Sequence, residues 1–427
     1  MTNPATFTAG DRELQLPFIP ATQGNNGYDI GKLLAKTGDT TYDNGFANTA
    51  VCKSAITYID GDAGVLQYRG YPIEQLAEKS TFLETSYLVL YGELPTSEEL
   101  EEFTQKISRH MVIDERLREL FRIFPRRSHP MPVLSAAITA LSTFSTDTIG
   151  FDSERVDAAT QRLMAKVPTL AAYSFKNSLG MPTLWPDYSL SYIENFLRMS
   201  FGTVTEPYQF DDDVTRALDV LLILHADHEQ NCSTSTVRLV GSSQANLYAS
   251  VSAGVHALSG PLHGGANQAV LEMLASIRDD GMSVRDYVLK VKDKKDTTKL
   301  MCFGHRIYKN YDPRAAIIKK HADAILKARE GSDQLLDIAL ELEEAALSDD
   351  YFVERKLYPN VDFYTGLIYK AIGFPTEMFT VLFAIGRLPG WIAQWREMIA
   401  DPATKIGRPR QLYTGPTERA FVELGDR

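Results

Sequence analysis

Five side chains that commonly bind metals lie within eight positions of one another, directly after the apolar run LDVLLIL. They are His225, Asp227, His228, Glu229 and Cys232. A helical zinc site usually has the pattern HExxH, whereas the spacing here is HxxH, which still places both rings on roughly one helix face. The hydroxyls of the following STSTVR are poor zinc ligands, and a helix that begins near residue 214 must end or bend here. Buried histidines bonded to the backbone are therefore the interpretation that competes with a metal site.

Three further residues have surroundings suited to acid–base chemistry. His263 lies in SGPLHGGANQ and His305 in MCFGHRIYKNYDPR, each beside glycine, which allows backbone and ligand to approach closely. Asp362 lies in KLYPNVDFYTG, which we expect to be a loop among aromatic rings. Desolvation raises the pKa of such a carboxyl, as suits a general base that works near neutral pH. Taken singly, each of these residues could also be an ordinary turn or cap residue.

The elements that must position these residues are mainly helical. Residues 1–70 are predicted to be β-rich and irregular, with a hairpin around the turn DGDAG in AITYIDGDAGVLQYRG. Helices are predicted from about residue 71 onward, and Thr81 with Glu84 and Thr96 with Glu99 have the spacing of capping boxes. The fold class is therefore mainly α, with a short β portion at the N-terminus.

Composition excludes several classes of protein. The 427 residues are 44% hydrophobic and 23% charged, with a formal net charge of −11. That charge argues against nucleic-acid binding. The sequence contains no run of about 18 apolar residues, so no membrane span is predicted. The first residues lack the pattern of a secretory signal, and three scattered cysteines favour a reducing cytoplasm. Basic clusters inside so acidic a chain suggest sites for small anions.

Several motifs occur together in a fixed order. They are ITYIDGDAGVLQYRGYPIEQLA, LHADHEQN, GPLHGGAN, CFGHRIYKNYDPR (where Cys302 replaces a glycine), LYPNVDFYTG and RPRQLYTG. With these motifs the chain resembles the citrate synthase family over nearly its full length. The β-rich N-terminal extension resembles the hexameric form found in Gram-negative bacteria.

The resemblance implies that acetyl-CoA condenses with oxaloacetate and water to give citrate and CoA. Asp362 matches the family's base, which removes the methyl proton of acetyl-CoA. His263 matches the donor to the thioester oxygen, and it should be neutral in order to stabilise the enolate. His305 matches the acid at the ketone oxygen of oxaloacetate.

The resemblance also implies a cationic site for the two carboxylates of oxaloacetate. Arginine suits this task because its planar fork pairs with a carboxylate through two charge-assisted bonds. The residues that match the family's oxaloacetate site are His228, Arg314, Arg387 and Arg408, with Arg408 reaching the neighbouring subunit's site. By sequence pattern alone, Arg387 would be placed at a helix end and Arg408 on the surface. His225 is predicted to be structural, and Asp227 and Glu229 to hold one tautomer of His228. No metal and no cofactor are predicted.

Coenzyme A brings phosphates, for which Arg306, Lys309 and Lys356 are the candidates. The implied architecture is a large helical domain, residues 71–263 plus 368–427, with a small helical domain of residues 264–367 inserted. A site divided in this way would be completed by domain closure, which excludes water.

Hexameric citrate synthases of Gram-negative bacteria are commonly inhibited by NADH. Arg162 and Lys166 have the i, i+4 spacing of a phosphate-binding pair, and Arg109 and His110 are also present. Ser145 and Thr205 replace a tyrosine and a cysteine of the family's pocket. Loss of aromatic stacking predicts that NADH binds weakly.

Three alternatives remain open at this point. A 2-methylcitrate synthase would use propionyl-CoA with the same catalytic residues, and the N-terminal extension argues against it. A metal-dependent hydrolase is disfavoured by the HxxH spacing. A non-catalytic acyl-CoA-binding regulator would need none of Asp362, His263 and His305.

Overall fold

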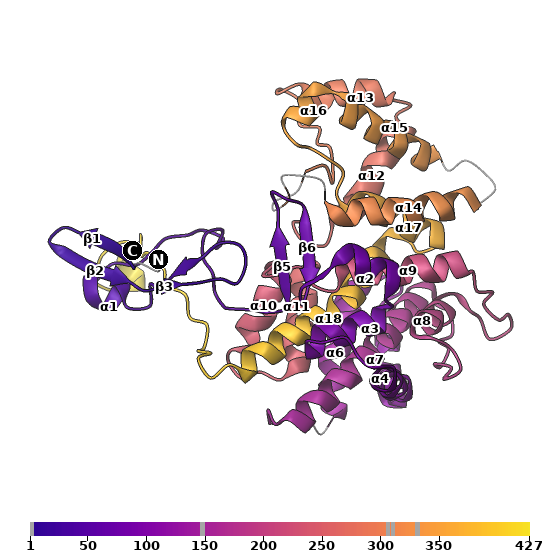
Figure 1. Ribbon diagram of the computed structural model, residues 1–427, viewed down its shortest axis with the longest axis horizontal. Coiled ribbons are helices and arrows are strands. Elements are labelled where there is room, and N and C mark those ends of the chain that lie inside the picture. The colour runs from indigo at the N-terminus through magenta and orange to yellow at the C-terminus, as the bar shows by residue number, and fades with distance from the viewer. Residues whose placement is uncertain (1–3, 146–149, 305–307, 309–311, 329–333) are drawn as a thin grey trace. The chain divides into compact units, whose positions relative to one another are not determined.

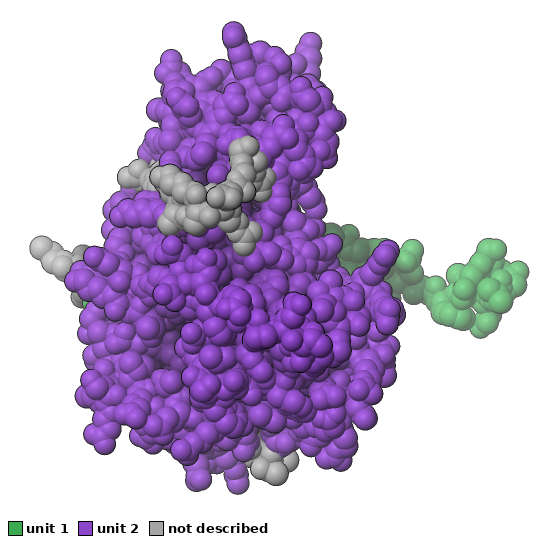
Figure 2. Space-filling model, turned by 90° about the vertical axis from the view of Figure 1, so that its right-hand side faces the viewer, with its two compact units in different colours: residues 1–53, 405–427 green, residues 54–404 purple. Residues whose placement is uncertain are grey.

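The computed structural model describes residues 4–145, 150–304, 308, 312–328 and 334–427. The chain divides into two compact units (Figure 2). Unit 1 consists of residues 1–53 and 405–427, and unit 2 of residues 54–404. The predicted division into residues 1–70, 71–263 with 368–427, and 264–367 is a different partition, and it stays a prediction.

Unit 1 contains two small antiparallel pairs of strands. Strand β1 (Ala5–Ala9) pairs with β2 (Arg12–Leu16) in a register that sets Ala5 opposite Leu16, and β3 (Phe18–Ile19) pairs with β4 (Gly27–Tyr28). A short helix, α1 (Leu33–Thr37), follows, and a 3₁₀ turn, η3 (Leu424–Asp426), lies at the other end of the chain. The β-rich N-terminal region is therefore as predicted.

The predicted hairpin forms at the start of unit 2. Strand β5 (Thr57–Asp60) pairs with β6 (Val65–Tyr68), and β7 (Tyr71–Pro72) extends this sheet. The Asp60 carboxylate accepts the N–H groups of Asp62 and Ala63, and Gly64 takes a positive φ of 70° that glycine adopts at little cost. The DGDAG turn therefore closes the hairpin through these local contacts.

The rest of unit 2 is helical (Figure 1). The helices before residue 260 are α2 (Ile73–Lys79), α3 (Phe82–Tyr91), α4 (Ser97–His110), α5 (Glu115–Ile123), α6 (Pro130–Leu141), η1 (Ser142–Phe144), α7 (Ser153–Leu179), α8 (Tyr192–Phe201), α9 (Asp212–His225), α10 (Cys232–Gly241) and α11 (Leu247–Leu258). Those after it are α12 (Ala266–Asp279), α13 (Val284–Lys292), α14 (Pro313–Ala328), α15 (Gln334–Ser348), α16 (Asp350–Glu354), α17 (Val361–Ile372), η2 (Thr376–Met378) and α18 (Phe379–Ala400). No described helix is long and apolar enough to cross a membrane.

The predicted helix starts are largely confirmed. Thr96 and Glu99 form the reciprocal capping box of α4. Thr81 caps α3 by accepting the N–H of Glu84. Each cap satisfies a backbone donor that the first turn of a helix leaves without a partner.

Helix α18 is the central element of unit 2. It packs against α3, α7, α9, α10 and α11, and nearly all of its residues are buried. A helix that is apolar on all sides requires such a central position. The sequence pattern placed a helix end at Arg387, but this is wrong, because α18 continues through Pro389 to Ala400. Just after Pro389, the N–H of Gly390 donates outside the helix, to the main-chain oxygen of Ala226 at 3.0 Å.

Helices α12 to α17 gather at one end of unit 2 (Figure 1). Helix α17 packs against both α12 and α14, while α15 packs against α12 and α13. This group carries Arg314 and Asp362, while His228 lies between α9 and α10 and Arg387 lies in α18.

Candidate active site

The HADHEQN segment is the loop that joins α9 to α10. Helix α9 ends at His225, and Asn231 caps α10 by accepting the N–H of Thr234. The two histidines therefore do not share a helix face, contrary to the prediction from the HxxH spacing. Within this loop Glu229 takes a positive φ of 55°, which is incompatible with a continuous right-handed helix from α9 to α10.

His225 is a structural residue of the helical core. Its side chain is fully buried, its Nδ1 lies 2.6 Å from the main-chain oxygen of Leu221, and its ring packs against Phe383 with centroids 4.6 Å apart. Burial lowers the pKa of His225 to about 3, so the ring is neutral. Among the residues that the structure describes, no group of three or more His, Cys, Asp or Glu side chains could hold a metal ion.

His228 contacts a residue from a distant motif. Its Nε2 lies 3.2 Å from the hydroxyl of Tyr308, and the two rings are in edge contact at 5.7 Å. Tyr308 is buried, as is His228. The two motifs LHADHEQN and CFGHRIYKNYDPR thus meet at this pair, which joins the α9–α10 loop to the segment before α14.

Arg314 lies beside the same tyrosine, with its guanidinium 5.8 Å from the Tyr308 ring centre. Its Nε and Nη2 donate to the two carboxylate oxygens of Asp312 at 3.0 and 2.9 Å. Burial acts to lower the pKa of Arg314, but the Asp312 carboxylate outweighs it and the pKa is raised. These two bonds occupy one edge of the guanidinium, in the bidentate geometry that arginine forms with a carboxylate.

Arg387 is buried in the middle of α18, which also overturns its interpretation as a helix-end charge. Its Nε donates to the main-chain oxygen of His225 at 2.6 Å, and its guanidinium lies 4.9 Å from the ring centre of Phe383. Burial lowers the pKa of Arg387 to about 10, with Asp227 opposing the shift. The guanidinium therefore remains charged at neutral pH and supplies a buried cation suited to a carboxylate.

His263 lies in the turn between α11 and α12 and contacts the first turn of α10. The Ser233 N–H donates to His263 Nε2 at 3.2 Å, and the Ser233 hydroxyl lies 2.8 Å from the same nitrogen. Trp391 in turn donates its indole N–H to that hydroxyl at 3.1 Å. Because a backbone N–H always carries its proton, Nε2 is the acceptor. We therefore assign the neutral tautomer with the proton on Nδ1.

Asp362 lies in the first turn of α17 and not in a loop as predicted. Asn360 caps this helix by accepting the Asp362 N–H at 3.0 Å. The side chain of Asp362 is half-buried, and burial raises the pKa of Asp362 to about 6, with Arg314 opposing the shift. The predicted direction of this shift is confirmed, and its cause is desolvation as expected.

A short bridge fixes the segment before His305 to the segment before Asp362. Gly304 N–H donates to Tyr358 O at 2.8 Å, and Asn360 N–H donates to Cys302 O at 3.0 Å. The Asn360 side chain adds a bond to Gly304 O at 3.1 Å. His305 itself lies outside the described residues, but the chain that leads to it is tied to the helix that carries Asp362.

Of the three candidate residues for coenzyme A, the structure describes Lys356. Arg306 and Lys309 lie outside the described residues. Lys356 is exposed just after α16, with a positive φ of 55°. Arg408 is exposed in unit 1, whereas the other described candidates for the active site belong to unit 2.

The candidate NADH residues lie on α4 and α7. Arg162 and Lys166 share α7, and Arg109 and His110 end α4. The Lys166 ammonium donates to the main-chain oxygens of His110, at 2.7 Å, and of Val112. Burial, and then the neighbouring Arg162, lower the pKa of Lys166 to about 8. Lys166 therefore caps the end of α4, which reduces its capacity to bind a phosphate.

The Ser145 hydroxyl, for its part, accepts a hydrogen bond from Tyr248 at 3.2 Å, and Thr205 lies 3.2 Å from Thr203 between hydroxyl oxygens. The hydroxyls of Ser145 and Thr205 thus each have a polar contact with a nearby side chain of this chain.

The sequence matches a known protein family over most of its length. A model described as citrate synthase, C-terminal domain, matches residues 45–410. The chain belongs to the citrate synthase family. It is 63% identical to citrate synthase 1 of Mycobacterium tuberculosis over 424 residues, 99% of this chain and 98% of the relative. It is 57% identical to citrate synthase of Corynebacterium glutamicum over 417 residues, 97% and 95% of the two chains.

Solved citrate synthases have the same fold. The structure from Pyrobaculum aerophilum matches with a TM-score of 0.83 and 37% identity, over 90% of this chain and 95% of that chain. A ternary complex of carboxymethyl coenzyme A and oxaloacetate with citrate synthase from Thermoplasma acidophilum matches with a TM-score of 0.83 and 31% identity, over 91% and 100%. The activity of the family, the condensation of acetyl-CoA with oxaloacetate, is the activity of this enzyme.

Proposed function

We propose that Asp362 is the general base of the condensation. The carboxylate takes a proton from the methyl group of acetyl-CoA, and the C–H electron pair moves to form the enolate. A base serves best when its pKa lies near the operating pH. The observation that carries this assignment is the half-buried Asp362 carboxyl, with its pKa raised to about 6.

We assign to His263 the stabilisation of the enolate oxygen. Its Nε2 is occupied by the Ser233 N–H, which leaves Nδ1–H as the donor toward the thioester oxygen. A neutral donor stabilises developing negative charge without transferring a proton that it would have to recover. By resemblance to the family, His305 protonates the ketone oxygen as the enolate carbon attacks, and water then hydrolyses the thioester to release CoA.

Oxaloacetate is proposed to bind where buried cations and His228 converge. Arg314 and Arg387 are both buried and charged, and His228 contacts Tyr308 next to Arg314. Arg408 of a neighbouring subunit is proposed to complete this site. Arg306, Lys309 and Lys356 are proposed to bind coenzyme A, and the group of helices α12–α17 is proposed to close over both substrates.

Acyl-chain preference can be measured directly. We expect purified enzyme to release CoA thiol from acetyl-CoA only when oxaloacetate is present. Propionyl-CoA should be used less efficiently, as judged by kcat/KM. The reverse order of kcat/KM would assign the chain to 2-methylcitrate synthesis, and no release from either thioester would favour a binding protein without catalysis.

Metal-independence is a further expectation, since Arg314, Arg387 and His228 together supply the positive charge and hydrogen bonds that polarise the substrate. Prolonged chelation followed by dialysis should leave kcat unchanged. A stoichiometric zinc content that rises and falls with activity would contradict this prediction. The control is the same dialysis without the chelator.

The assembly is proposed to be a cytoplasmic homohexamer built from dimers, similar to the Gram-negative type. The support is the β-rich region in unit 1, which precedes the helices.

NADH is expected to inhibit weakly or not at all at submillimolar concentration, while the oligomer persists. Lys166 already bonds the end of α4, and Ser145 offers no aromatic surface for stacking. Steady-state titration with NADH at fixed acetyl-CoA tests this prediction. Half-inhibition at low micromolar NADH would contradict it.

A further inference from the structure

The loop of residues 226–231 carries His228 and is braced from one side by the β5–β6 hairpin. Tyr68 donates its hydroxyl proton to the main-chain oxygen of Asp227 at 3.0 Å. Thr57 donates its hydroxyl proton to Asp227 Oδ2 at 2.6 Å. The hairpin, which contributes none of the proposed catalytic groups, therefore contacts the residue directly before His228.

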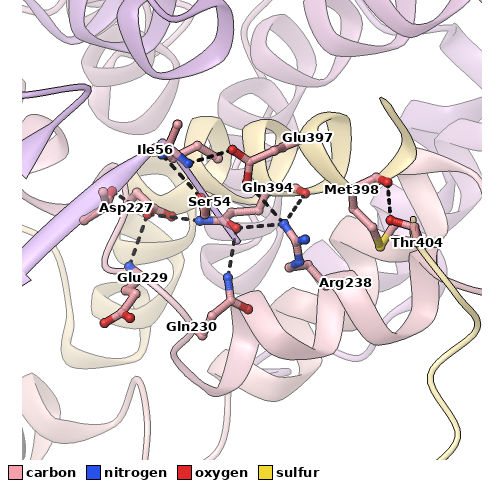
Figure 3. A network of polar contacts seen from close by, with 12 residues as sticks. Ser54, Ile56, Asp227, Glu229, Gln230, Arg238, Gln394, Glu397, Met398 and Thr404 are labelled. Atoms are coloured by element: carbon pink, nitrogen blue, oxygen red, sulfur yellow. Dashed lines mark hydrogen bonds and ion pairs between the residues drawn. The ribbon is translucent and has the colours of Figure 1, made fainter. Parts of the chain in front are cut away.

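Helix α18 also contacts this loop (Figure 3). Gln394 donates from Nε2 to Asp227 Oδ2 at 3.4 Å, and its Oε1 accepts from Gln230 at 2.9 Å and from Arg238 at 3.1 Å. Gln394 thus bridges Asp227 and Gln230, which lie on either side of His228 in the sequence.

The Asp227 carboxylate is where these braces meet. It is fully buried, and Oδ2 also accepts the N–H of Glu229 at 3.2 Å, within the turn where Glu229 takes its positive φ. Burial raises the pKa of the Asp227 carboxyl, and the Arg387 guanidinium and the bond from Thr57 oppose this shift. A buried carboxylate requires such donors, and charge-assisted bonds are the stronger ones. The shortest of them comes from Thr57, so loss of the Thr57 hydroxyl would affect this carboxylate most.

We propose that Thr57 is a positioning residue for oxaloacetate, which acts through Asp227 to hold the turn that orients His228. The proposal rests on the assignment of His228 to the oxaloacetate site. Thr57 itself touches no substrate in this scheme. Its effect should therefore appear in the affinity for oxaloacetate and not in the chemistry of acetyl-CoA.

Thr57→Val tests the proposal because valine keeps the shape of threonine and removes the hydroxyl. We expect KM for oxaloacetate to rise about tenfold or more, as the loss of a bond to a charged group implies. KM for acetyl-CoA and kcat at saturating oxaloacetate should change less than about twofold. Thr57→Ser, which retains the hydroxyl, should restore KM. Thr85→Val, the same change at a fully buried threonine of α3, is the matched control and should leave both KM values unchanged.

His228→Ala separates failure of this proposal from failure of the oxaloacetate assignment. If His228→Ala raises KM for oxaloacetate and Thr57→Val does not, the positioning role is wrong and the assignment stands. If His228→Ala leaves KM unchanged, the assignment itself is wrong. The double variant should raise KM less than the product of the two single effects, because both changes act on one group. If Thr57→Val lowers the yield of folded enzyme but leaves both KM values unchanged, the role of Thr57 is purely structural.

Discussion

Asp362→Asn is expected to lower kcat by at least about 10². The amide keeps the size of the carboxyl but cannot accept the methyl proton of acetyl-CoA. Oxaloacetate binding should be retained, because His228, Arg314 and Arg387 are unchanged. Steady-state rates give the loss of turnover, and calorimetric titration with oxaloacetate gives the affinity.

The pH dependence supplies a second test of the same residue. Burial raises the pKa of Asp362 to about 6, and the base must be ionised to act. The wild-type kcat/KM for acetyl-CoA should therefore fall as the pH is lowered through about 6. Asp350→Asn makes the same change in the first turn of α16, at an exposed position, and should leave rate and pH profile intact. Near-normal turnover in Asp362→Asn would contradict the assignment of Asp362 as the general base.

His263→Ala is expected to lower kcat by about 10² to 10³, the usual cost of removing one donor to a developing oxyanion. The reason is that the Ser233 N–H fixes Nε2 as an acceptor, so that Nδ1–H is the donor of the neutral ring. KM for oxaloacetate should change little, since His263 is assigned to the thioester. Rates and both KM values from one steady-state matrix check this expectation.

The matched control is His256→Ala, which removes an exposed histidine from the neighbouring helix α11. It should retain wild-type kcat. Equal losses in the two variants would mean that the His263 effect arises from folding and not from catalysis. If His263→Ala leaves kcat unchanged but raises KM for oxaloacetate, His263 would be assigned to the oxaloacetate site instead of the thioester.

Sequence patterns predicted the features of this molecule that depend on near neighbours. The hairpin at DGDAG and the capping box of Thr96 with Glu99 follow from turn and cap chemistry within a few residues. The raised pKa of Asp362 agrees in direction with the sequence-based expectation, and burial is its largest cause. The helix that begins near residue 214 was predicted to end or bend only at STSTVR, whereas α9 ends earlier, at His225.

Features that depend on distant contacts were missed. Asp312 and Tyr308 gave no local signal beyond their place in a motif, yet one pairs with Arg314 and the other contacts His228. The hydroxyls of STSTVR were dismissed as poor metal ligands, but Ser233 proved to be the partner of His263. Arg387 was placed at a helix end in AIGRLPG, a segment in which Pro389 and Gly390 follow it. This placement was wrong because α18 is packed on all sides, which outweighs the bond that proline removes.

The close approach of α18 to the end of α9 limits which substitutions can be accepted at two glycines of α18 during evolution. A methyl group on Gly390 would lie 2.2 Å from the main-chain oxygen of Ala226, and one on Gly386 would lie 2.9 Å from the β-carbon of His225. Neither position accepts a side chain unless the chain at 225–227 moves, and that chain leads directly into the oxaloacetate loop. A lineage that acquires alanine at position 390 would have to change the loop in the same step or lose the geometry around His228. Substitution of either glycine therefore requires a compensating change in the loop, although neither glycine has a side chain that could take part in the reaction.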